Sequence, residues 1–207
     1  MKPLETSQGR EEKAKKSHRT IRTISIILAI IMVSSTIGYA ILETSQKENK
    51  TTYGDYKFIQ TDSSWQTQVA VSNQIIVLNS DYLPQDVENI SFDGSISTDD
   101  FLGKGIFIVA SSGLERQKAE KFNVLSPIAL RMQLACPYNS SAGFCIDYNM
   151  PEKDCSDADS STSIIIISED NETSANYGSY CLTIKGNGDE LAKAVENAIF
   201  RIFGILN

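Results

Sequence analysis

Histidine is almost absent from this chain. The 207 residues include one, His18, and it precedes an uncharged stretch at residues 23–42. Everything after that stretch therefore lacks an imidazole. This excludes, from the larger part of the chain, the Ser-His-Asp and Cys-His schemes of nucleophilic catalysis, histidine-ligated zinc and a histidine general base. Carboxylate, hydroxyl, thiol and lysine chemistry remains.

Nucleotide-binding and redox motifs are missing as well. The chain has no G-x-G-x-x-G or Walker pattern and no C-x-x-C spacing, which disfavours a nucleotide cofactor, a four-cysteine zinc site and thiol redox chemistry. At Ser111-Ser112-Gly113, between a predicted buried strand and a predicted helix, backbone N–H groups could hold an anion. Acidic residues outnumber basic ones, 26 to 19, which disfavours a nucleic acid partner. No cofactor is expected.

The uncharged stretch at residues 23–42 is long enough to cross a membrane. A helix of this length measures about 30 Å, which is the thickness of the hydrocarbon core of a bilayer. Residues 1–22 carry seven Lys or Arg and three Glu, whereas the chain from Glu43 onward carries twelve basic and twenty-three acidic residues. The positive-inside rule then predicts a single-pass protein of the cell membrane, with its N-terminus in the cytoplasm and its C-terminal domain outside.

A cleaved secretory signal is the alternative interpretation of the same stretch. Gly38 and Ala40 fit a small-x-small cleavage site. The apolar run is longer than the core of a signal peptide, which is about 7–15 residues, and the tail before it is also long. An uncleaved signal-anchor is therefore favoured, and both interpretations export the same domain.

These features divide the chain into four parts. Residues 1–22 form a basic cytoplasmic tail, and residues 23–42 form the transmembrane helix. Residues 43–52, rich in Ser, Thr, Glu, Lys and Asn, form a polar stalk. Residues 53–207 remain, and their length suits one compact extracytoplasmic domain.

Two residue patterns agree with export of that domain. Asn-x-Ser/Thr triplets mark four possible glycosylation sites, at Asn49, Asn89, Asn139 and Asn171. The four cysteines of the chain, an even number, lie in the same part and indicate two disulfides: Cys136, Cys145, Cys155 and Cys181.

Four cysteines allow three pairings. We favour Cys136 with Cys145 and Cys155 with Cys181, because each pair then brackets one local excursion of the chain. Buried free thiols are the alternative, and the order of pairing is not fixed by the sequence.

The domain begins with the pattern of an antiparallel meander. Tyr56 and Phe58 alternate with polar neighbours, and residues 65–71 keep a period of two. Ser72-Asn73 then fits a tight turn before residues 74–78. Three successive strands are therefore predicted. The Leu83-Pro84-Gln85-Asp86-Val87 segment after them resembles a turn or a short helical piece.

The rest of the domain mixes buried strands with helices. Continuous apolar runs within residues 105–110 and 163–168 predict strands that are covered on both faces, and a further strand is expected at residues 180–184. Helical patterns occupy three segments: residues 114–122, a helix that begins at Ser126-Pro127 and ends before Pro137, and a last helix capped by Asp189 that ends at Gly204.

That last helix carries an apolar stripe from Leu191 to Phe203, and its opposite, polar face carries Glu190, Lys193, Glu196 and Arg201. The predicted fold is therefore an α/β or α+β domain. Its mixed sheet, with the meander at its N-terminal end, is packed by helices.

Acidic residues supply the remaining candidates for chemistry. Asp157-x-Asp159-x-Ser161 resembles the start of a calcium loop, but Thr162 stands where an EF-hand needs Gly and Ser168 where it needs Glu. A solvated acidic loop is the favoured interpretation. The pairs Asp99-Asp100 and Glu169-Asp170 could supply an acid and a base for glycoside cleavage if they faced a common cleft.

Aromatic residues are candidates for binding a partner. Tyr53, Tyr56, Phe58 and Trp65 lie in the first hairpin, and Tyr138, Phe144 and Tyr148 surround the segment between Cys136 and Cys145. A carbohydrate or protein partner could use such rings, although core packing accounts for most of them.

A resemblance to a protein family is carried by several short features besides the basic tail, the apolar stretch and the stalk. They are Tyr56-Lys57-Phe58, Trp65, the stretch Leu83-Pro84-Gln85-Asp86-Val87-Glu88-Asn89-Ile90, Cys155, Cys181 and Phe203-Gly204-Ile205. Together they resemble a group of small, uncharacterised single-pass membrane proteins predicted from archaeal genomes. The resemblance implies the location, the architecture and a pair between Cys155 and Cys181, but no activity.

The sequence therefore predicts a membrane-anchored extracytoplasmic interaction or structural module that contacts the lipid bilayer and an envelope protein or glycan. No catalytic residue is assigned. Two alternatives stay open: a carboxylate-dependent hydrolase of cell-surface polymers, and a sensor or assembly subunit whose basic tail contacts a cytoplasmic partner or anionic lipid.

Overall fold

The computed structural model of the chain describes residues 49–207, which form one compact unit. The predicted tail, the predicted membrane helix and most of the predicted stalk lie outside the described residues. Within residues 49–207, no helix is both long enough and apolar enough to span a bilayer.

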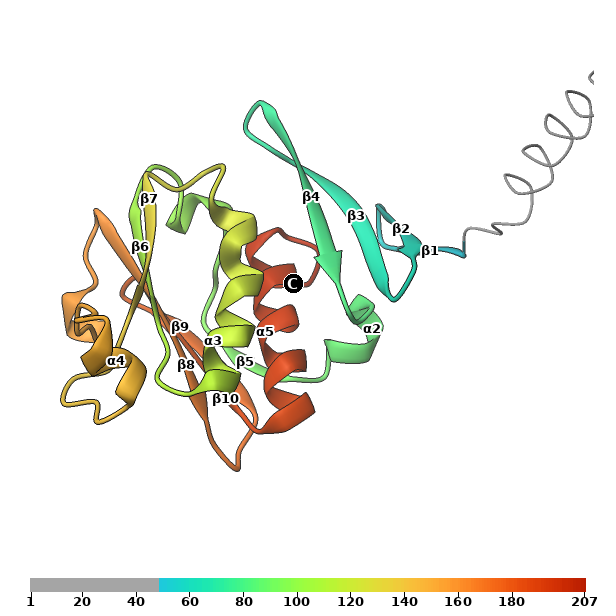
Figure 1. The fold of residues 1–207 in the computed structure, drawn as a ribbon. Helices are drawn as coiled ribbons and strands as arrows, with labels where there is room; N and C mark the ends of the chain where they lie inside the picture. Colours follow the sequence, from blue (N-terminus) through green and yellow to red (C-terminus); the bar gives the residue numbers. More distant parts are fainter. Residues whose placement is uncertain (1–48) are drawn as a thin grey trace, which may run out of the picture. The chain divides into compact units, whose positions relative to one another are not determined.

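A small antiparallel sheet comes first in the described chain (Figure 1). Its strands follow one another in the order β1 (Lys50–Tyr53), β2 (Tyr56–Thr61), β3 (Ser64–Val71) and β4 (Gln74–Ser80). The predicted meander is confirmed, with Ser72 in the left-handed region at the β3–β4 turn (φ 54°). Strand β1 is an addition, and it takes up the last three residues of the segment assigned to the stalk.

The second sheet has six strands in the order β5-β9-β10-β8-β6-β7. Strands β10, β8, β6 and β7 run parallel, and β9 runs antiparallel to β10. The strands of this mixed sheet span β5 (Ser91–Asp93), β6 (Gly105–Val109), β7 (Arg131–Ala135), β8 (Thr162–Glu169), β9 (Ser174–Gly178) and β10 (Cys181–Gly186). The two apolar runs became its central strands, β6 and β8, as predicted.

Helices connect and cover these strands. The α-helices are α2 (Pro84–Val87), α3 (Gly113–Ala119), α4 (Gly143–Asp147) and α5 (Gly188–Ile202). Three 3₁₀ segments add η1 (Thr98–Asp100), η2 (Glu120–Leu125) and η3 (Cys155–Asp157). Helix α3 with η2 corresponds to the helix predicted at residues 114–122, and α5 begins after Asn187 rather than at Asp189.

The helix predicted from Ser126 is wrong. Its second half is strand β7, which pairs in parallel with β6 from Gly105 opposite Arg131 to Val109 opposite Ala135. The apolar residues of this segment fit a helical spacing, but Met132 and Leu134 also fit the period of two that is typical of a strand. Both of these side chains pack against the main core. Parallel pairing with the buried strand β6 along the whole of β7 outweighs a local helical preference.

The main core lies within three layers, in which helices separate the two sheets. Helix α5 and the α3–η2 segment lie between the small sheet and the large sheet (Figure 1). Phe58 of β2 meets Phe200 of α5 edge to face, with ring centroids 6.0 Å apart at 89°. Because α5 is covered from both sides, the polar face predicted for it is partly wrong, since Glu196 is only 2% exposed.

The opposite face of the large sheet has a much smaller core. Side chains alternate along β8, so that Ile165 and Ile167 point to the helices while Ile164 and Ile166 point away from them. Five buried residues form the second cluster: Phe107, Val109, Ala135, Ile164 and Cys181. Residues 137–161, here called the α4 segment, contain α4 and η3 and cover this face.

Candidate functional site

The carboxyl ends of β6 and β8 lie side by side and form a topological switch point. The chain leaves β6 through α3 toward β7, but it leaves β8 in the other direction, toward β9 and β10. In open α/β sheets the crevice at such a point is where ligands bind. Ser111, Ser112, Glu115 and Glu169 gather there.

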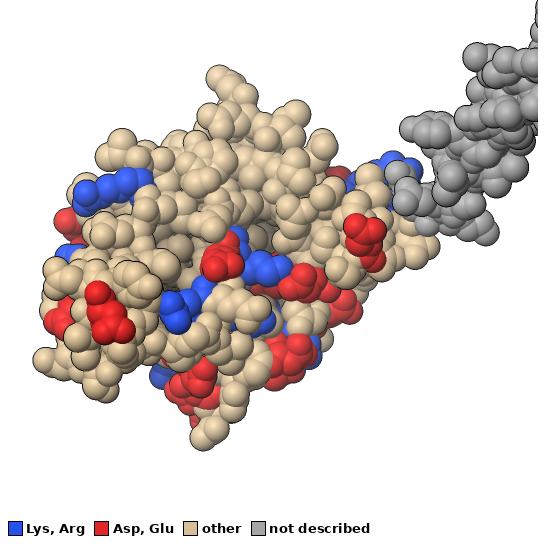
Figure 2. Space-filling model, in the orientation of Figure 1, with Lys and Arg blue, Asp and Glu red and all other residues tan. Residues whose placement is uncertain are grey.

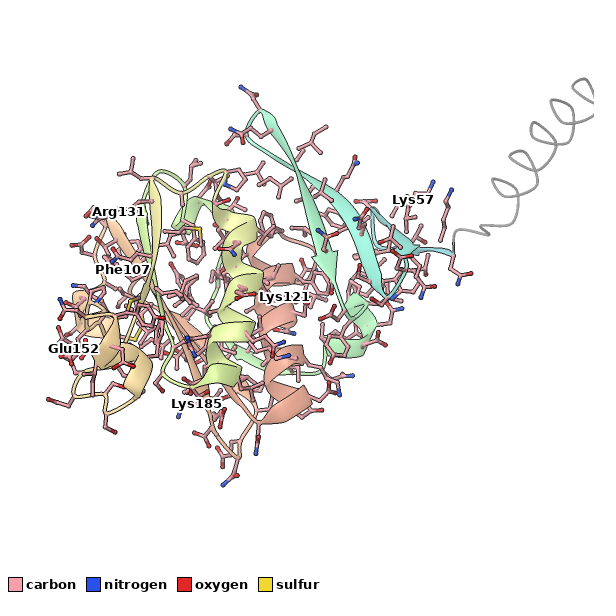
Figure 3. The ribbon with its side chains drawn as sticks, viewed as in Figure 1. Lys57, Phe107, Lys121, Arg131, Glu152 and Lys185 are labelled. Atoms are coloured by element: carbon pink, nitrogen blue, oxygen red, sulfur yellow. A yellow bond between two sulfur atoms is a disulfide. The ribbon has the colours of Figure 1, made fainter. Side chains whose placement is uncertain are left out.

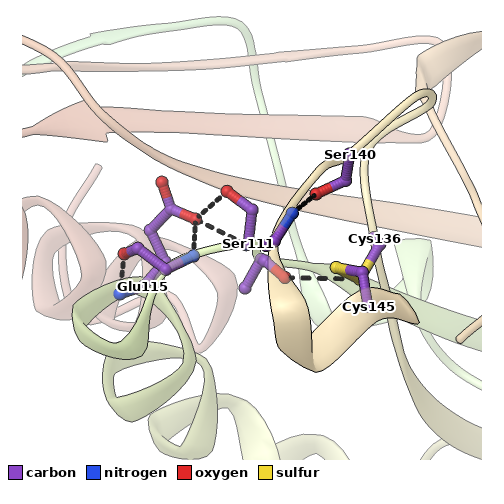
Figure 4. The surroundings of a disulfide bond; sticks show 8 residues. Ser111, Glu115, Cys136, Ser140 and Cys145 are labelled. Carbon is purple, nitrogen blue, oxygen red and sulfur yellow. Dashed lines mark hydrogen bonds between the residues drawn. A yellow bond between two sulfur atoms is a disulfide. The ribbon is translucent and has the colours of Figure 1, made fainter. Parts of the chain in front are cut away.

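Glu115 occupies the backbone groups that the sequence suggested for an anion (Figure 4). Its Oε2 accepts the N–H of Ser111 at 2.6 Å, the N–H of Ser112 at 2.9 Å and the Ser111 hydroxyl at 2.9 Å. Its Oε1 accepts the N–H of Glu169 at 3.0 Å. The side chain is 6% exposed. The chain thus supplies its own anion at the start of α3.

Electrostatics keep this carboxylate charged. Burial works to raise the pKa of Glu115, but the hydrogen bonds from the backbone of Ser112, Ser111 and Glu169 outweigh it, and the pKa is lowered. The Ser112 hydroxyl accepts the N–H of Glu115 at 3.1 Å and donates to Glu169 at 2.9 Å. Each residue of this cluster has a hydrogen-bond partner within it. The cluster, here called the clamp, therefore holds the ends of β6 and β8 and the start of α3 together.

Next to this clamp lies a loop that is held at its base. Residues 137–150, here called the α4 loop, leave β7 at Cys136 and return beside it. Cys136 is disulfide-bonded to Cys145. Its backbone N–H donates to Pro151 at 2.8 Å, and its carbonyl accepts the N–H of Lys153 at 2.8 Å. The base of the α4 loop is therefore closed by one covalent and two hydrogen bonds.

The second disulfide joins Cys155 of η3 to Cys181 of β10. It fastens the end of the α4 segment to the sheet beneath it. Both pairs are those that the sequence favoured, and the 49–207 part holds no free cysteine. Phe107 of β6 lies under this cover (Figure 3), with Lys153 Nζ 5.3 Å from its ring centroid.

Large apolar side chains are exposed on the α4 loop. Ile146 is 66% exposed and Tyr148 is 72% exposed. The rings of Phe144 and Tyr148 have centroids 5.5 Å apart. The guanidinium of Arg116 on α3 stacks 4.0 Å from the centroid of the Phe144 ring and so ties the loop to the main core. The sequence marked the aromatic residues here, but it gave no signal for α4.

The calcium candidates do not share a site. Asp157 accepts from the backbone N–H of Asp154 at 2.9 Å and pairs with Lys153 at 3.1 Å, whereas Asp159 accepts the N–H of Ser161 at 2.7 Å and the hydroxyl of Ser161 at 2.8 Å. Each carboxylate closes its own turn. In the described part of the chain no group of three or more His, Cys, Asp or Glu is placed to hold a metal ion.

The two carboxylate pairs are also dispersed. Asp100 accepts the N–H of Ser97 at 2.8 Å near the start of β8, while Glu169 and Asp170 lie at its far end. Asp170 pairs there with Lys185 at 3.3 Å. The structure brings these acids to opposite ends of an eight-residue strand rather than to one cleft.

All four possible glycosylation sites are exposed: Asn49, Asn89, Asn139 and Asn171. Asn139 adopts a left-handed conformation, with φ 57°, in the α4 loop. Accessibility is the condition that a sugar acceptor must meet, and each site meets it. Modification of these residues stays a prediction.

An ionic cluster around the buried Glu196 joins the small sheet to the helices. Lys121 of η2 lies 3.1 Å from Glu196 and 2.8 Å from Asp81, which follows β4. Burial works to lower the pKa of Lys121, but the two carboxylates of Asp81 and Glu196 outweigh it, and the pKa is raised. Burial raises the pKa of Glu196, and the charge of Lys121 together with hydrogen bonds from Lys121, Ser80 and the backbone of Asp81 only partly offsets this. The sequence gave no signal for this ionic cluster.

Comparison with known proteins identifies no relative. No family model, no curated protein and no solved structure matches the chain. The resemblance to single-pass archaeal membrane proteins stays a prediction.

Proposed function

We propose that this protein is a membrane-anchored extracytoplasmic interaction module that binds a partner protein through the α4 loop. The observation that carries the proposal is the combination of exposed Ile146 and Tyr148 with a base closed by the Cys136–Cys145 disulfide. The anchor is the apolar stretch at residues 23–42. Disulfides at this loop also suit an oxidising compartment outside the cytoplasm.

The fixed base supports binding because it lowers the entropy lost on association. A flexible loop must be ordered when a partner binds, at a cost of about 0.5–1.5 kcal/mol for each immobilised side chain. The α4 loop is ordered beforehand by its disulfide and by the Arg116 stack on Phe144. Aromatic side chains presented in this way are typical centres of protein interfaces.

The surroundings of the α4 loop favour a protein over a glycan. The rings of Phe144 and Tyr148 are tilted by 45° and so form no flat platform for a sugar ring. Ile146 adds an aliphatic side chain that fits an apolar pocket. Exposed Asp147 lies in the loop and exposed Glu152 follows it, so the partner is expected to place basic residues around that pocket.

The test is site-directed photocrosslinking of the full chain in its native membrane. A photoreactive phenylalanine at Tyr148 should give one defined protein adduct, and the same residue at Leu130, which is 76% exposed but lies on another surface, should not. Ile146→Ala should reduce the yield about tenfold, which corresponds to about 1.4 kcal/mol. Equal adducts from both positions, or adducts with glycan only, would contradict the proposal.

A further inference from the structure

The small sheet has one face that no other element of the described structure covers. Its inner face carries Phe58, Val69 and Leu78, all buried in the main core. Side chains alternate along a strand, so the residues between them point outward. On this outer face the exposed apolar residues are Ile75 and Val77, 71% and 46% exposed. Ile75 is opposite Ala70 and Val77 is opposite Gln68 in the β3–β4 pair.

The β3–β4 part of this face is also distinguished by its lack of charge. Residues 63–80 contain no Asp, Glu, Lys or Arg, although 22% of the chain is charged. Residues 50–80 hold two basic and two acidic residues, whereas residues 81–207 hold nine basic and nineteen acidic ones. In Figure 2 the β3–β4 hairpin is accordingly free of red and blue. The negative charge of the domain is thus kept away from the small sheet.

The position of the small sheet in the chain limits how far it can lie from a membrane. Seven residues separate Leu42, the end of the apolar stretch, from Lys50, the start of β1. Even fully extended, at about 3.3–3.6 Å per residue, they span about 25 Å. A tether of this length raises the effective concentration of the face at the bilayer surface, so that weak contacts suffice to occupy it.

We infer that the outer face of the small sheet rests on the lipid surface, with Ile75 and Val77 in the interfacial region. The inference rests on the membrane anchor of the proposed function. A hollow of about 330 Å³ supports it, because its lining combines polar and apolar residues of this face, among them Lys57, Ile59, Gln66, Gln68 and Val77. Such a mixture matches the boundary between headgroups and acyl chains. The α4 loop is not part of this face and stays available to a partner.

The test is tryptophan quenching by brominated lipids, with the full chain reconstituted in phosphatidylcholine vesicles. Trp65, the only tryptophan, is first replaced by Phe. We expect at least about twofold quenching for Ile75→Trp and almost none for Leu130→Trp, because only the first residue would lie at bilayer depth. Val77→Trp in a chain that keeps Trp65 repeats the measurement without changing a core-facing side chain.

A third position separates failure of this inference from failure of the proposed function. Ile30→Trp lies in the apolar stretch and reports on insertion of the anchor. Quenching at Ile30 without quenching at Ile75 overturns this inference alone. Absence of quenching at both positions overturns the inference and the anchor together. A blue shift of the Ile75→Trp emission that grows with protein density, without quenching, would show a second copy on this face and would also overturn the inference.

Discussion

The two faces of the large sheet are stabilised in different ways. On one face Ile165, Ile167 and their neighbours belong to an extensive core that includes both α5 and the small sheet. On the other face Ile164 lies in a cluster of five buried residues, and both disulfides hold the cover in place. The same strand, β8, supplies side chains to both faces.

The difference shows what covalent bonds do in a domain of this kind. A helix packed between two sheets buries enough apolar surface to stay in place by itself. The α4 segment buries little, so its position depends on links that reduce the freedom of the unfolded chain. The exposed apolar residues of the α4 loop are consistent with this division, because side chains that serve a partner cannot also serve the core.

The largest expected effect comes from adjacent residues of β8 that face opposite ways. Ile165→Ala should lower the free energy of unfolding by about 4 kcal/mol, because it leaves a cavity in the well-packed main core. Ile164→Ala should cost about 2 kcal/mol, because fewer apolar neighbours lose contact. Urea denaturation of the full chain in detergent, with the disulfides intact, gives both values. Equal losses would show that the two faces are equally well packed.

Removal of the disulfides tests the other side of the comparison. In the chain-entropy treatment, replacing Cys155 and Cys181 by Ala should cost about 3.5 kcal/mol, and replacing Cys136 and Cys145 about 2.6 kcal/mol. The order follows from the sequence separations of 26 and 9 residues. Hydrogen exchange should rise in residues 137–161 in both variants and stay slow in α5. Faster exchange in α5 would contradict the separation of the two faces.

Glu115 lies at the carboxyl ends of β6 and β8, at the edge of the large sheet. Glu115→Gln should lower the free energy of unfolding by about 2 kcal/mol, because the amide group of Gln turns a donor toward backbone N–H groups. The pKa of Glu115 is lowered in the folded state, so its contribution is present above the ordinary glutamate pKa of about 4.3 and is lost as the pH falls through the lowered value. The variant should therefore approach the wild type in acid. A difference that is independent of pH would exclude the charged clamp.

Glu196→Gln supplies the matched control on the helix-covered side, with an expected effect below about 1 kcal/mol, because the partly exposed Lys121 keeps Asp81 as a partner at 2.8 Å. Its pKa is raised in the folded state, so the stability it contributes is present below about pH 4.3 and declines as the pH rises through the raised value. The variant should thus gain on the wild type as the pH rises above about 4.3, opposite to Glu115→Gln. A parallel pH profile for the two variants would refute the assigned environments.

Much of the fold could be predicted because its signals are local. The alternation of Val69 and Val71, the apolar run from Ile106 to Val109 and the stripe of α5 each specify an element within a few residues. The segment from Ser126 to Ala135 could not be assigned, because its apolar spacing fits two periods. Only pairing with β6, twenty-six residues earlier at Gly105 and Arg131, decides between them.

The site was harder to predict because long-range contacts, which no local pattern records, determine it. Ser111-Ser112-Gly113 indicated backbone groups suited to an anion, but the anion proved to be Glu115, two residues beyond that tripeptide. The burial of Glu196 depends on a second sheet above α5, and no pattern within α5 records that sheet. Long-range contacts thus decided which acids became structural and which apolar residues stayed exposed.

The place of α5 in the chain constrains how this protein is made. This helix fills the space between the two sheets, yet the ribosome makes it after every strand of residues 49–207. The meander is synthesised first, and its Phe58 and Leu78 side chains stay exposed until Phe200 has been synthesised. Nascent chains stalled before Gly188 should consequently bind chaperones and be cleaved by proteases, because the apolar side chains that α5 covers stay exposed until it is made.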